Sequence, residues 1–234
     1  MGNKLLLTPI FFFLFVGSLQ ANKISFSKAK KQLVKMYQAY PEATTIYCGC
    51  DIKWKGKKGM PDVESCGYIP RKAVTQSGKV NQRAKRIEWE HVMPAYWFGH
   101  QLQCWQDGGG KSCKKNKQFK IMEGDMHNLQ PAIGELNANR SNYRFTILEG
   151  ELRKYGQCDF EVDFKAKKTE PPLAVRGNIA RTFFYMSDRY KLKLSEQQKQ
   201  LFHLWDKSDP VDDWERVRNK LIGKVQGNVN PYIN

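Results

Sequence analysis

The sequence predicts a single α+β domain, and three observations support that prediction. The chain has 234 residues, enough to bury one sizeable core, and no internal repeat or low-complexity linker divides it. Short strand patterns occupy its middle, at residues 86–92 and 128–130, whereas the last third repeats its apolar residues at helical spacing. Strands and helices that are segregated along the chain are typical of α+β folds.

The first residues are expected to be a leader rather than part of the fold. Met1–Lys4 is short and basic, Leu5–Val16 is almost wholly apolar, and small residues lead to a cleavage point after Ala21. An uncleaved membrane anchor is the alternative, but about twelve apolar residues fall short of the roughly twenty that cross a bilayer. We therefore expect residues 1–21 to be a secretory signal and residues 22–234 to be the exported domain, with no membrane partner after cleavage.

The exported part is expected to begin with a helix. Ser25 or Ser27 can cap a helix over residues 28–39, which Pro41 ends. Residues 44–72 are rich in turn residues and cysteines, and they predict short strands and loops.

The middle of the chain predicts a strand, a loop, a second strand and a helix. Residues 86–92 alternate well enough for the first strand, and residues 128–130 form the second. Pro131 stands where it can open the helix, because proline fits the first helical position. This order of elements brings His91 and Asn137 within reach of each other.

The last third predicts three helices. Residues 173–190 form the first, and Ser195 with Gln198 resembles a capping box at the start of the second. A stripe of apolar residues between Val211 and Val225 marks the third. The core candidates of the first of these helices are Ile179, Phe183, Phe184 and Met186.

All the cysteines follow the leader. They are Cys48, Cys50, Cys66, Cys104, Cys113 and Cys158. An even count in an exported chain favours disulfides, and zinc ligation would need Cys-x-x-Cys pairs that this chain lacks. We expect three disulfides, with Cys104 bonded to Cys113 because the glycines at 108–110 can turn the chain back between them. The other four cysteines allow three pairings, which the sequence leaves open.

The net charge of +16 predicts a polyanionic partner, which could be nucleic acid, anionic lipid or acidic polysaccharide. The lysines gather in four clusters, any one of which is more often a solvated face than a binding patch. Together they favour a surface for a phosphate backbone. The clusters are Lys28-Lys30-Lys31, Lys53-Lys55-Lys57-Lys58, Lys111-Lys114-Lys115-Lys117 and Lys165-Lys167-Lys168.

The most informative stretch is Glu-Trp-Glu-His at residues 88–91, together with residues 125–128 and Asn137. These residues gather carboxylates, imidazoles and carboxamides without a thiol, which is the side-chain set for an oxygen-ligated cation beside a general base. On so basic a chain, such a site indicates phosphodiester hydrolysis. The chemistry alone leaves several rivals for these roles, namely Glu88, Glu90, Asp125, Asn128 and the histidines.

Glu90 and His91 are neighbours, which is a difficulty for a metal ligand and a base in one site. Adjacent side chains of a regular strand point to opposite faces, whereas Glu88 and Glu90 share one face. The strand is therefore expected to end or kink near His91, and Pro94 permits this.

A series of longer motifs spans nearly all of the exported part. They lie at residues 47–50, 65–68, 88–95, 98–101, 104–109, 125–131, 155–158, 176–182 and 225–228. In this order they resemble the endonuclease I family, whose members are periplasmic or secreted, sequence-nonspecific bacterial nucleases.

The resemblance implies a ββα-metal finger that holds a single divalent cation, expected to be Mg²⁺, with Mn²⁺ or Ca²⁺ as alternatives. By the same resemblance, His91 matches the general base, Glu90 the carboxylate metal ligand, and Asn137 the amide ligand. The partners implied are DNA, double- or single-stranded, and RNA, bound through the phosphate backbone by a monomer. The expected supporting residues are Asn128, His127 and Glu88.

The chain departs from the family at one position near the expected site. Where relatives carry an arginine after the paired glycines of the cysteine-bounded loop, this chain has Gly110 followed by Lys111. Lysine supplies charge without the bidentate fork of arginine, which leaves two alternatives: activity is weaker than in relatives, or Lys111 substitutes for the arginine in steadying the phosphate.

The sequence thus predicts an exported, magnesium-dependent, sequence-nonspecific endonuclease that leaves 5′-phosphate ends. A secreted ribonuclease and a non-catalytic polyanion-binding protein are the alternatives. The intact set of Glu90, His91 and Asn137 argues against the binding protein, because a pure binder does not need it. The disulfides lead to a further hypothesis, that the reduced cytosolic chain folds poorly and so spares the host's own DNA.

Overall fold

The computed structural model describes residues 24–150 and 153–234, so the expected leader lies outside the described residues. The helices are α1 (Phe26–Ala39), α2 (Val63–Cys66), α3 (Ala95–Gly99), α4 (Gln103–Cys113), α5 (Lys117–Glu123), α6 (Gly134–Arg140), α7 (Arg176–Tyr190), α8 (Glu196–Ser208) and α9 (Asp213–Gln226). The strands are β1 (Ile52–Lys55), β2 (Lys58–Pro61), β3 (Ile87–His91), β4 (Leu129–Ile133), β5 (Arg144–Phe145), β6 (Glu161–Asp163) and β7 (Lys168–Glu170). Short 3₁₀ helices are η1 (Gln82–Lys85), η2 (Met126–Asn128) and η3 (Leu173–Val175).

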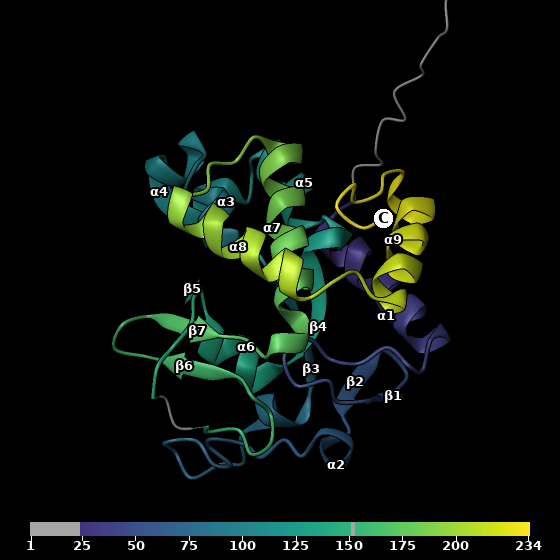
Figure 1. Ribbon diagram of the computed structural model, residues 1–234, viewed down its shortest axis with the longest axis vertical. Coiled ribbons are helices and arrows are strands. Elements are labelled where there is room, and N and C mark those ends of the chain that lie inside the picture. Colours follow the sequence, from purple (N-terminus) through teal and green to yellow (C-terminus); the bar gives the residue numbers. More distant parts are fainter. Residues whose placement is uncertain (1–23, 151–152) are drawn as a thin grey trace, which may run out of the picture.

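The strands form small separate sheets among the helices, which confirms the α+β class. Strands β1 and β2 pair antiparallel, β3 and β4 pair antiparallel, and β5, β7 and β6 form a third sheet in which β5 and β7 run parallel. In Figure 1, helices α3, α4 and α5 lie together beside α7 and α8, whereas α1 and α9 lie at the other edge. Within the described residues, no helix is long and apolar enough to cross a membrane.

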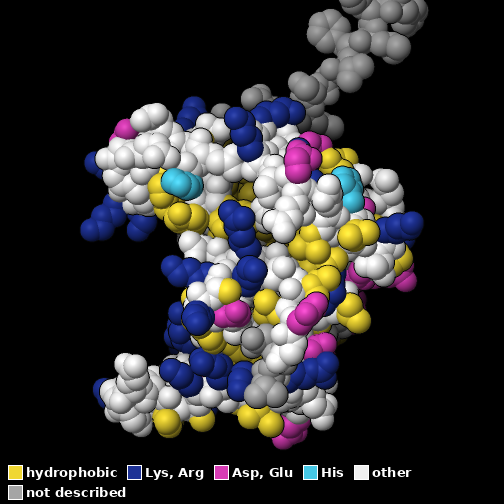
Figure 2. Space-filling model, turned by 60° about the vertical axis from the view of Figure 1, so that its left-hand side comes forward, with side chains coloured by type: hydrophobic (Ala, Val, Ile, Leu, Met, Phe, Trp, Pro, Cys, Tyr) yellow, Lys and Arg dark blue, Asp and Glu magenta, His cyan; other side chains and the backbone are white. Residues whose placement is uncertain are grey.

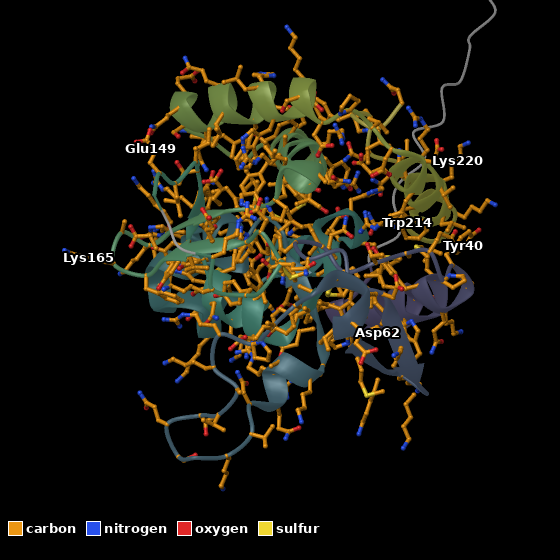
Figure 3. The ribbon with its side chains drawn as sticks, turned by 60° about the horizontal axis from the view of Figure 1, so that its bottom comes forward. Tyr40, Asp62, Glu149, Lys165, Trp214 and Lys220 are labelled. Atoms are coloured by element: carbon orange, nitrogen blue, oxygen red, sulfur yellow. A yellow bond between two sulfur atoms is a disulfide. The ribbon has the colours of Figure 1, made fainter. Side chains whose placement is uncertain are left out.

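Two groups of buried side chains hold these parts together. The larger core lies around α7 and α8, and the four α7 core candidates, Ile179, Phe183, Phe184 and Met186, are all buried in it. The smaller core joins α1 to α9 and to β4. At its edge the rings of Tyr40 and Trp214 lie side by side, with centroids 5.6 Å apart (Figure 3).

Helices α1 and α8 begin after serines whose side chains accept a hydrogen bond from a backbone N–H of the first turn. Ser25 accepts a bond from the Lys28 amide at the start of α1, which confirms the predicted first helix. Ser195 likewise accepts from the Gln198 amide at the start of α8, although only this half of the expected capping box is present. Helices α3 to α5, over residues 95–123, have no counterpart in the sequence prediction.

Strand β4 corrects the prediction for Pro131, which lies inside the strand and not at the start of a helix. Its carbonyl accepts a bond from the Ile46 amide on the edge away from β3. Since a residue's N–H and C=O point to the same side of a strand, the missing proline N–H removes no bond to β3. Proline is therefore tolerated opposite Trp89, and helix α6 begins only at Gly134.

Three disulfides close the chain, as predicted. Cys104 bonds to Cys113, which confirms the expected pair. The two pairings that the sequence left open are Cys48–Cys158 and Cys50–Cys66. They tie the segment before β1 to the segment before β6 and to α2.

Candidate active site

Glu90 is held at the centre of the β3–β4–α6 finger by one of its two oxygens. The residue is 3% exposed, and its Oε1 accepts bonds from the Tyr47 hydroxyl at 2.8 Å and from Arg140 Nη1 at 3.0 Å. Burial raises the pKa of Glu90, while the Arg140 guanidinium opposes that shift. Within the described residues, no hydrogen bond falls on Oε2, so this oxygen keeps its lone pairs for another partner.

The side chain of Asn137 faces β3 from the first turns of α6. Its Nδ2 donates to Glu88 Oε2 at 3.0 Å, while Arg83 and Arg86 pair with the same carboxylate. Because the carboxamide nitrogen is engaged by Glu88, the orientation of the group is fixed and its Oδ1 remains available as an acceptor. Glu88, which the sequence analysis names as a supporting residue, thus contacts Asn137.

The ring of His91 is oriented by a backbone carbonyl. Its Nε2 lies 2.9 Å from the Glu123 carbonyl oxygen, at the end of α5. A carbonyl only accepts, so Nε2 carries the proton and Nδ1 carries the lone pair of a base. The rings of Phe26 and Phe98 pack beside the imidazole, at centroid distances of 4.9 and 6.1 Å. Burial lowers the pKa of His91 to about 4, so the ring is neutral at pH 7.

Glu90 and His91 point to different neighbours, as strand alternation requires. Strand β3 pairs regularly with β4 through His91 opposite Leu129 and ends there, as the sequence analysis expects. Glu88 and Glu90 contact α6, whereas the His91 ring contacts residues from α1, α3 and α5. The finger thus brings Glu88 together with Asn137, and it places His91 at the strand's last residue.

Sequence reasoning missed Arg140, which joins the two sides of the site. The side chain is 1% exposed and donates to Glu90, to the His91 carbonyl at 3.0 Å and to the Val92 carbonyl at 2.6 Å. Arg140 follows Asn137 by three residues on α6, so helical spacing could have placed both on one face. Tyr47 lies in the family motif at residues 47–50, but neither its contact with Glu90 nor that of the Glu123 carbonyl with His91 has a signal in the sequence, because both depend on tertiary packing.

Asn128 and His127 support different parts of the molecule. Asn128 is fully buried, and its side chain bonds to both backbone groups of Met93, at 2.7 and 2.9 Å, which fixes the chain just after His91. His127 contacts the last part of the chain instead: its Nε2 lies 3.0 Å from the Asn228 carbonyl. Its ring packs on Tyr185, and burial lowers its pKa to about 4.

Lys111 is exposed near the end of α4, which is broken at Gly108 and Gly109. The glycine pair has backbone angles that are not helical, so the expected turn is a kink within α4. Burial raises the pKa of Glu123, and Lys114, Lys30 and Lys120 oppose that shift. Because Lys114 follows Lys111 by one helical turn, the basic end of α4 lies toward the residue that orients His91.

The residues of the finger fit a hard divalent cation. Glu90 Oε2 and Asn137 Oδ1 are oxygen acceptors whose partner atoms are already bonded, and Mg²⁺ binds through one or two such oxygens while it keeps several waters. No group of three or more His, Cys, Asp or Glu side chains in the described parts of the chain could hold a metal. A carboxylate paired with a carboxamide is therefore the ligand set that the finger offers.

The family model for Endonuclease I matches residues 25–234. The chain belongs to the endonuclease I family. A periplasmic deoxyribonuclease of Aeromonas hydrophila is 55% identical over 210 residues, which cover 89% of this chain and 85% of that protein. Endonuclease-1 of Buchnera aphidicola subsp. Acyrthosiphon pisum is 47% identical over 232 residues, covering 96% and 87%. An extracellular ribonuclease of Bacillus subtilis is 34% identical over 141 residues, covering 51% and 48%.

The names of the relatives agree with the export expected from the sequence. They include periplasmic and extracellular deoxyribonucleases that cover most of this chain. This endonuclease I member is therefore a periplasmic or secreted protein.

A basic groove runs beside the finger of this endonuclease I member. It has a volume of about 1260 Å³ and lies between α1, the β1–β2 turn and the start of β3. It brings together two lysine clusters that are separate in the sequence, and no Asp or Glu is among its described lining residues. Its cations are Lys28, Lys30, Lys31, Lys35, Lys55, Lys57, Lys58, Lys85 and Arg86.

Proposed function

We propose that this protein is a magnesium-dependent, sequence-nonspecific endonuclease that hydrolyses phosphodiester bonds of DNA and also of RNA, acting as a monomer. The observation that carries the proposal is the imidazole of His91, which the Glu123 carbonyl holds with Nδ1 as the basic nitrogen. It stands at the family's base position, in a chain that is 55% identical to a deoxyribonuclease over 210 residues.

His91 begins the proposed reaction as a general base. Its Nδ1 takes a proton from a water molecule, and the resulting hydroxide attacks phosphorus opposite the 3′-oxygen. The P–O3′ bond breaks and the departing oxygen takes a proton from solvent water, so the products carry a 5′-phosphate and a 3′-hydroxyl. Lys111 steadies the phosphate charge in place of the family arginine.

Glu90 and Asn137 are the proposed ligands of the cation. When bound there, Mg²⁺ would neutralise charge on the phosphate and stabilise the departing oxygen, and Mn²⁺ or Ca²⁺ could take the same oxygens. Tyr47 and Arg140 hold the carboxylate for this role, and Glu88 holds the carboxamide.

The groove beside α1 is the proposed binding site of the substrate. Its lysines contact phosphates and not base edges, which explains cleavage with little sequence preference. Cleavage and binding are therefore expected to weaken steeply as salt rises.

The test compares the wild type with His91→Ala on supercoiled plasmid and on RNA, each with Mg²⁺ and with EDTA. We expect nicking by the wild type only with Mg²⁺, and a loss of at least about a hundredfold in the variant, as removal of a general base produces. His203→Ala is the matched control, because His203 is exposed on α8 and lies outside both the finger and the groove. Full plasmid nicking by His91→Ala would refute the mechanism.

Ribonuclease activity is the second candidate for the natural function. The similarity to an extracellular ribonuclease of Bacillus subtilis over half of the chain favours it. The same assay separates the two, because the ratio of RNA to DNA cleavage at equal nucleotide concentration names the preferred substrate.

A further inference from the structure

A second hollow lies away from the groove, between α3, the β5–β7 strands and the start of α8. Its volume is about 620 Å³, and it shares no lining residue with the groove beside α1. Figure 2 shows this side of the molecule, where Lys and Arg side chains run along the middle of the face. No Asp or Glu is among its described lining residues.

The cations of this hollow come from separate segments that the fold fixes together. Arg144 and Lys168 are paired positions of the parallel strands β5 and β7, so their side chains share a face. Lys193 is held from the opposite wall by Gln101, which accepts from its amide at 2.7 Å and donates to its carbonyl at 3.2 Å. Together with Lys167, these residues present a concave positive surface.

Aromatic rings lie beside the cations. Tyr96 is 43% exposed, and its ring is braced at 90° against Trp105 and rests 5.2 Å from the His100 ring. Trp97 is fixed by its Nε1 bond to the Asn142 carbonyl, with the Arg144 guanidinium 5.7 Å from its ring. An exposed ring that is braced next to cations, as that of Tyr96 is, is a feature on which proteins stack the bases of single strands.

We propose that this hollow is a second binding site for nucleic acid, specific for a single-stranded segment. Phosphates contact Arg144, Lys168 and Lys193, while a base stacks on Tyr96. A rigid duplex has its bases stacked inside and cannot offer them to Tyr96, whereas a free strand can. The site would hold the strand beyond the point of cleavage, and in this role it rests on the proposed function.

The test measures binding of a fluorescent oligothymidylate of about eight nucleotides, a length within the range of single-strand sites. A His91→Ala background with Mg²⁺ prevents cleavage during the measurement. Lys168→Ser/Lys193→Ser should raise the Kd about tenfold and lower the slope of log Kd against log salt by about 1.4, since each phosphate contact contributes about 0.7.

Lys207→Ser/Lys220→Ser is the matched control, because both lysines are exposed and line neither cavity. Lys220 on α9 lies at the opposite side of the molecule from Lys165 in the β6–β7 turn (Figure 3). This double variant loses the same charge, and it should bind the oligonucleotide within about twofold of the background protein, because general field effects are screened by salt.

Two further measurements separate this inference from the proposed function. With His91 intact, the Lys168→Ser/Lys193→Ser variant should cut a short duplex at the wild-type rate but show a raised KM on long single-stranded DNA. If the wild type binds the oligonucleotide through this hollow yet cuts nothing, the nuclease proposal fails and the second site stands. If the hollow variants bind and cut as the wild type does, or if photo-cross-links of a bromouridine strand fall only in the groove beside α1, the second site is refuted.

Discussion

Tyr47 and Arg140 both bond to the same oxygen of Glu90. The other oxygen of the carboxylate is therefore the one that can bind a further partner. Both bonds reach Oε1, so the negative charge is kept in a buried position while the second oxygen remains unengaged. Asn137 repeats the arrangement, since Glu88 engages its nitrogen and leaves its oxygen. In both residues the neighbours fix the side chain and leave free the oxygen that we propose as a metal ligand.

Glu88→Ala should raise the Mg²⁺ concentration for half-maximal cleavage about tenfold or more, because outer partners of metal ligands typically contribute 10–100-fold. The reason is that Asn137 loses the acceptor that fixes its carboxamide. Glu88→Gln keeps an acceptor oxygen and should show a smaller shift. A magnesium titration of plasmid nicking measures this, and identical half-saturation in all three proteins would contradict it.

His127 should make stability depend on pH. Burial lowers its folded pKa to about 4, whereas an unfolded histidine titrates near 6.5. Between these values only the unfolded chain binds the proton, so the stabilisation is complete above about pH 6.5 and is lost as pH falls to 4. The loss from this one residue is about 3 kcal/mol, from 1.36 kcal/mol per pKa unit.

His127→Gln keeps a donor toward the Asn228 carbonyl but does not titrate. In urea unfolding at pH 7 and pH 5, this variant should lose less stability on acidification than the wild type. His203→Gln is the control, because it removes an exposed histidine by the same substitution. Equal pH dependence in all three proteins would contradict the prediction.

At the scale of the element, the finger was predictable in its order but not in its boundaries. Alternation marked β3, and the spacing from His91 to Asn137 indicated a strand, a loop, a strand and a helix. The prediction that Pro131 opens a helix was wrong. Opposite Trp89, a proline removes no hydrogen bond to β3, and this position depends on the register of the two strands. Register is a tertiary property that local propensity does not contain.

Helix α4 shows the same limit. The glycines at 108–109 indicated a turn, and the structure makes them a kink between two helical pieces joined by Cys104–Cys113. The family motifs identified the candidate site residues in the sequence. The contacts that Tyr47, Arg140 and the Glu123 carbonyl make with them are seen only in the structure. Contacts between segments that lie far apart in the chain have no periodic signature in the sequence.

Lys111 at the end of α4 can be tested directly. Lys111→Ala should lower the cleavage rate on the order of tenfold, because a hydrogen bond to a charged group is worth roughly 1.5–3 kcal/mol. Lys111→Arg should match or exceed the wild type, because arginine adds the bidentate fork. Single-turnover cleavage measures the effect against Lys115→Ala, an exposed neighbour. Unchanged rates in Lys111→Ala would remove this residue from the mechanism.

At the scale of the whole molecule, one disulfide joins distant parts of the chain. Cys48–Cys158 closes a sequence separation of 110 residues, whereas Cys104–Cys113 closes 9. Because a disulfide reduces the entropy of the unfolded chain, the long closure should stabilise the fold by about 5 kcal/mol and the short one by roughly 3 kcal/mol. The long closure is therefore the larger contribution to stability.

Cys48→Ser/Cys158→Ser should accordingly lose more free energy of unfolding than Cys104→Ser/Cys113→Ser, as urea titration of the oxidised proteins would show. Fully reduced wild type should cleave plasmid more slowly than the oxidised protein. Cleavage at the oxidised rate after complete reduction would refute the dependence on disulfides.

The disulfide between Cys48 and Cys158 also lies next to a residue that holds Glu90. Tyr47 precedes Cys48, and its ring stacks at 4.4 Å on Phe160, two residues after Cys158, while its hydroxyl holds Glu90. A newly made chain without this bond lacks the covalent link that keeps the tyrosine and the phenylalanine together. A producing cell would then be protected by the thiol chemistry of its own cytosol, and it could synthesise this enzyme without a dedicated inhibitor protein.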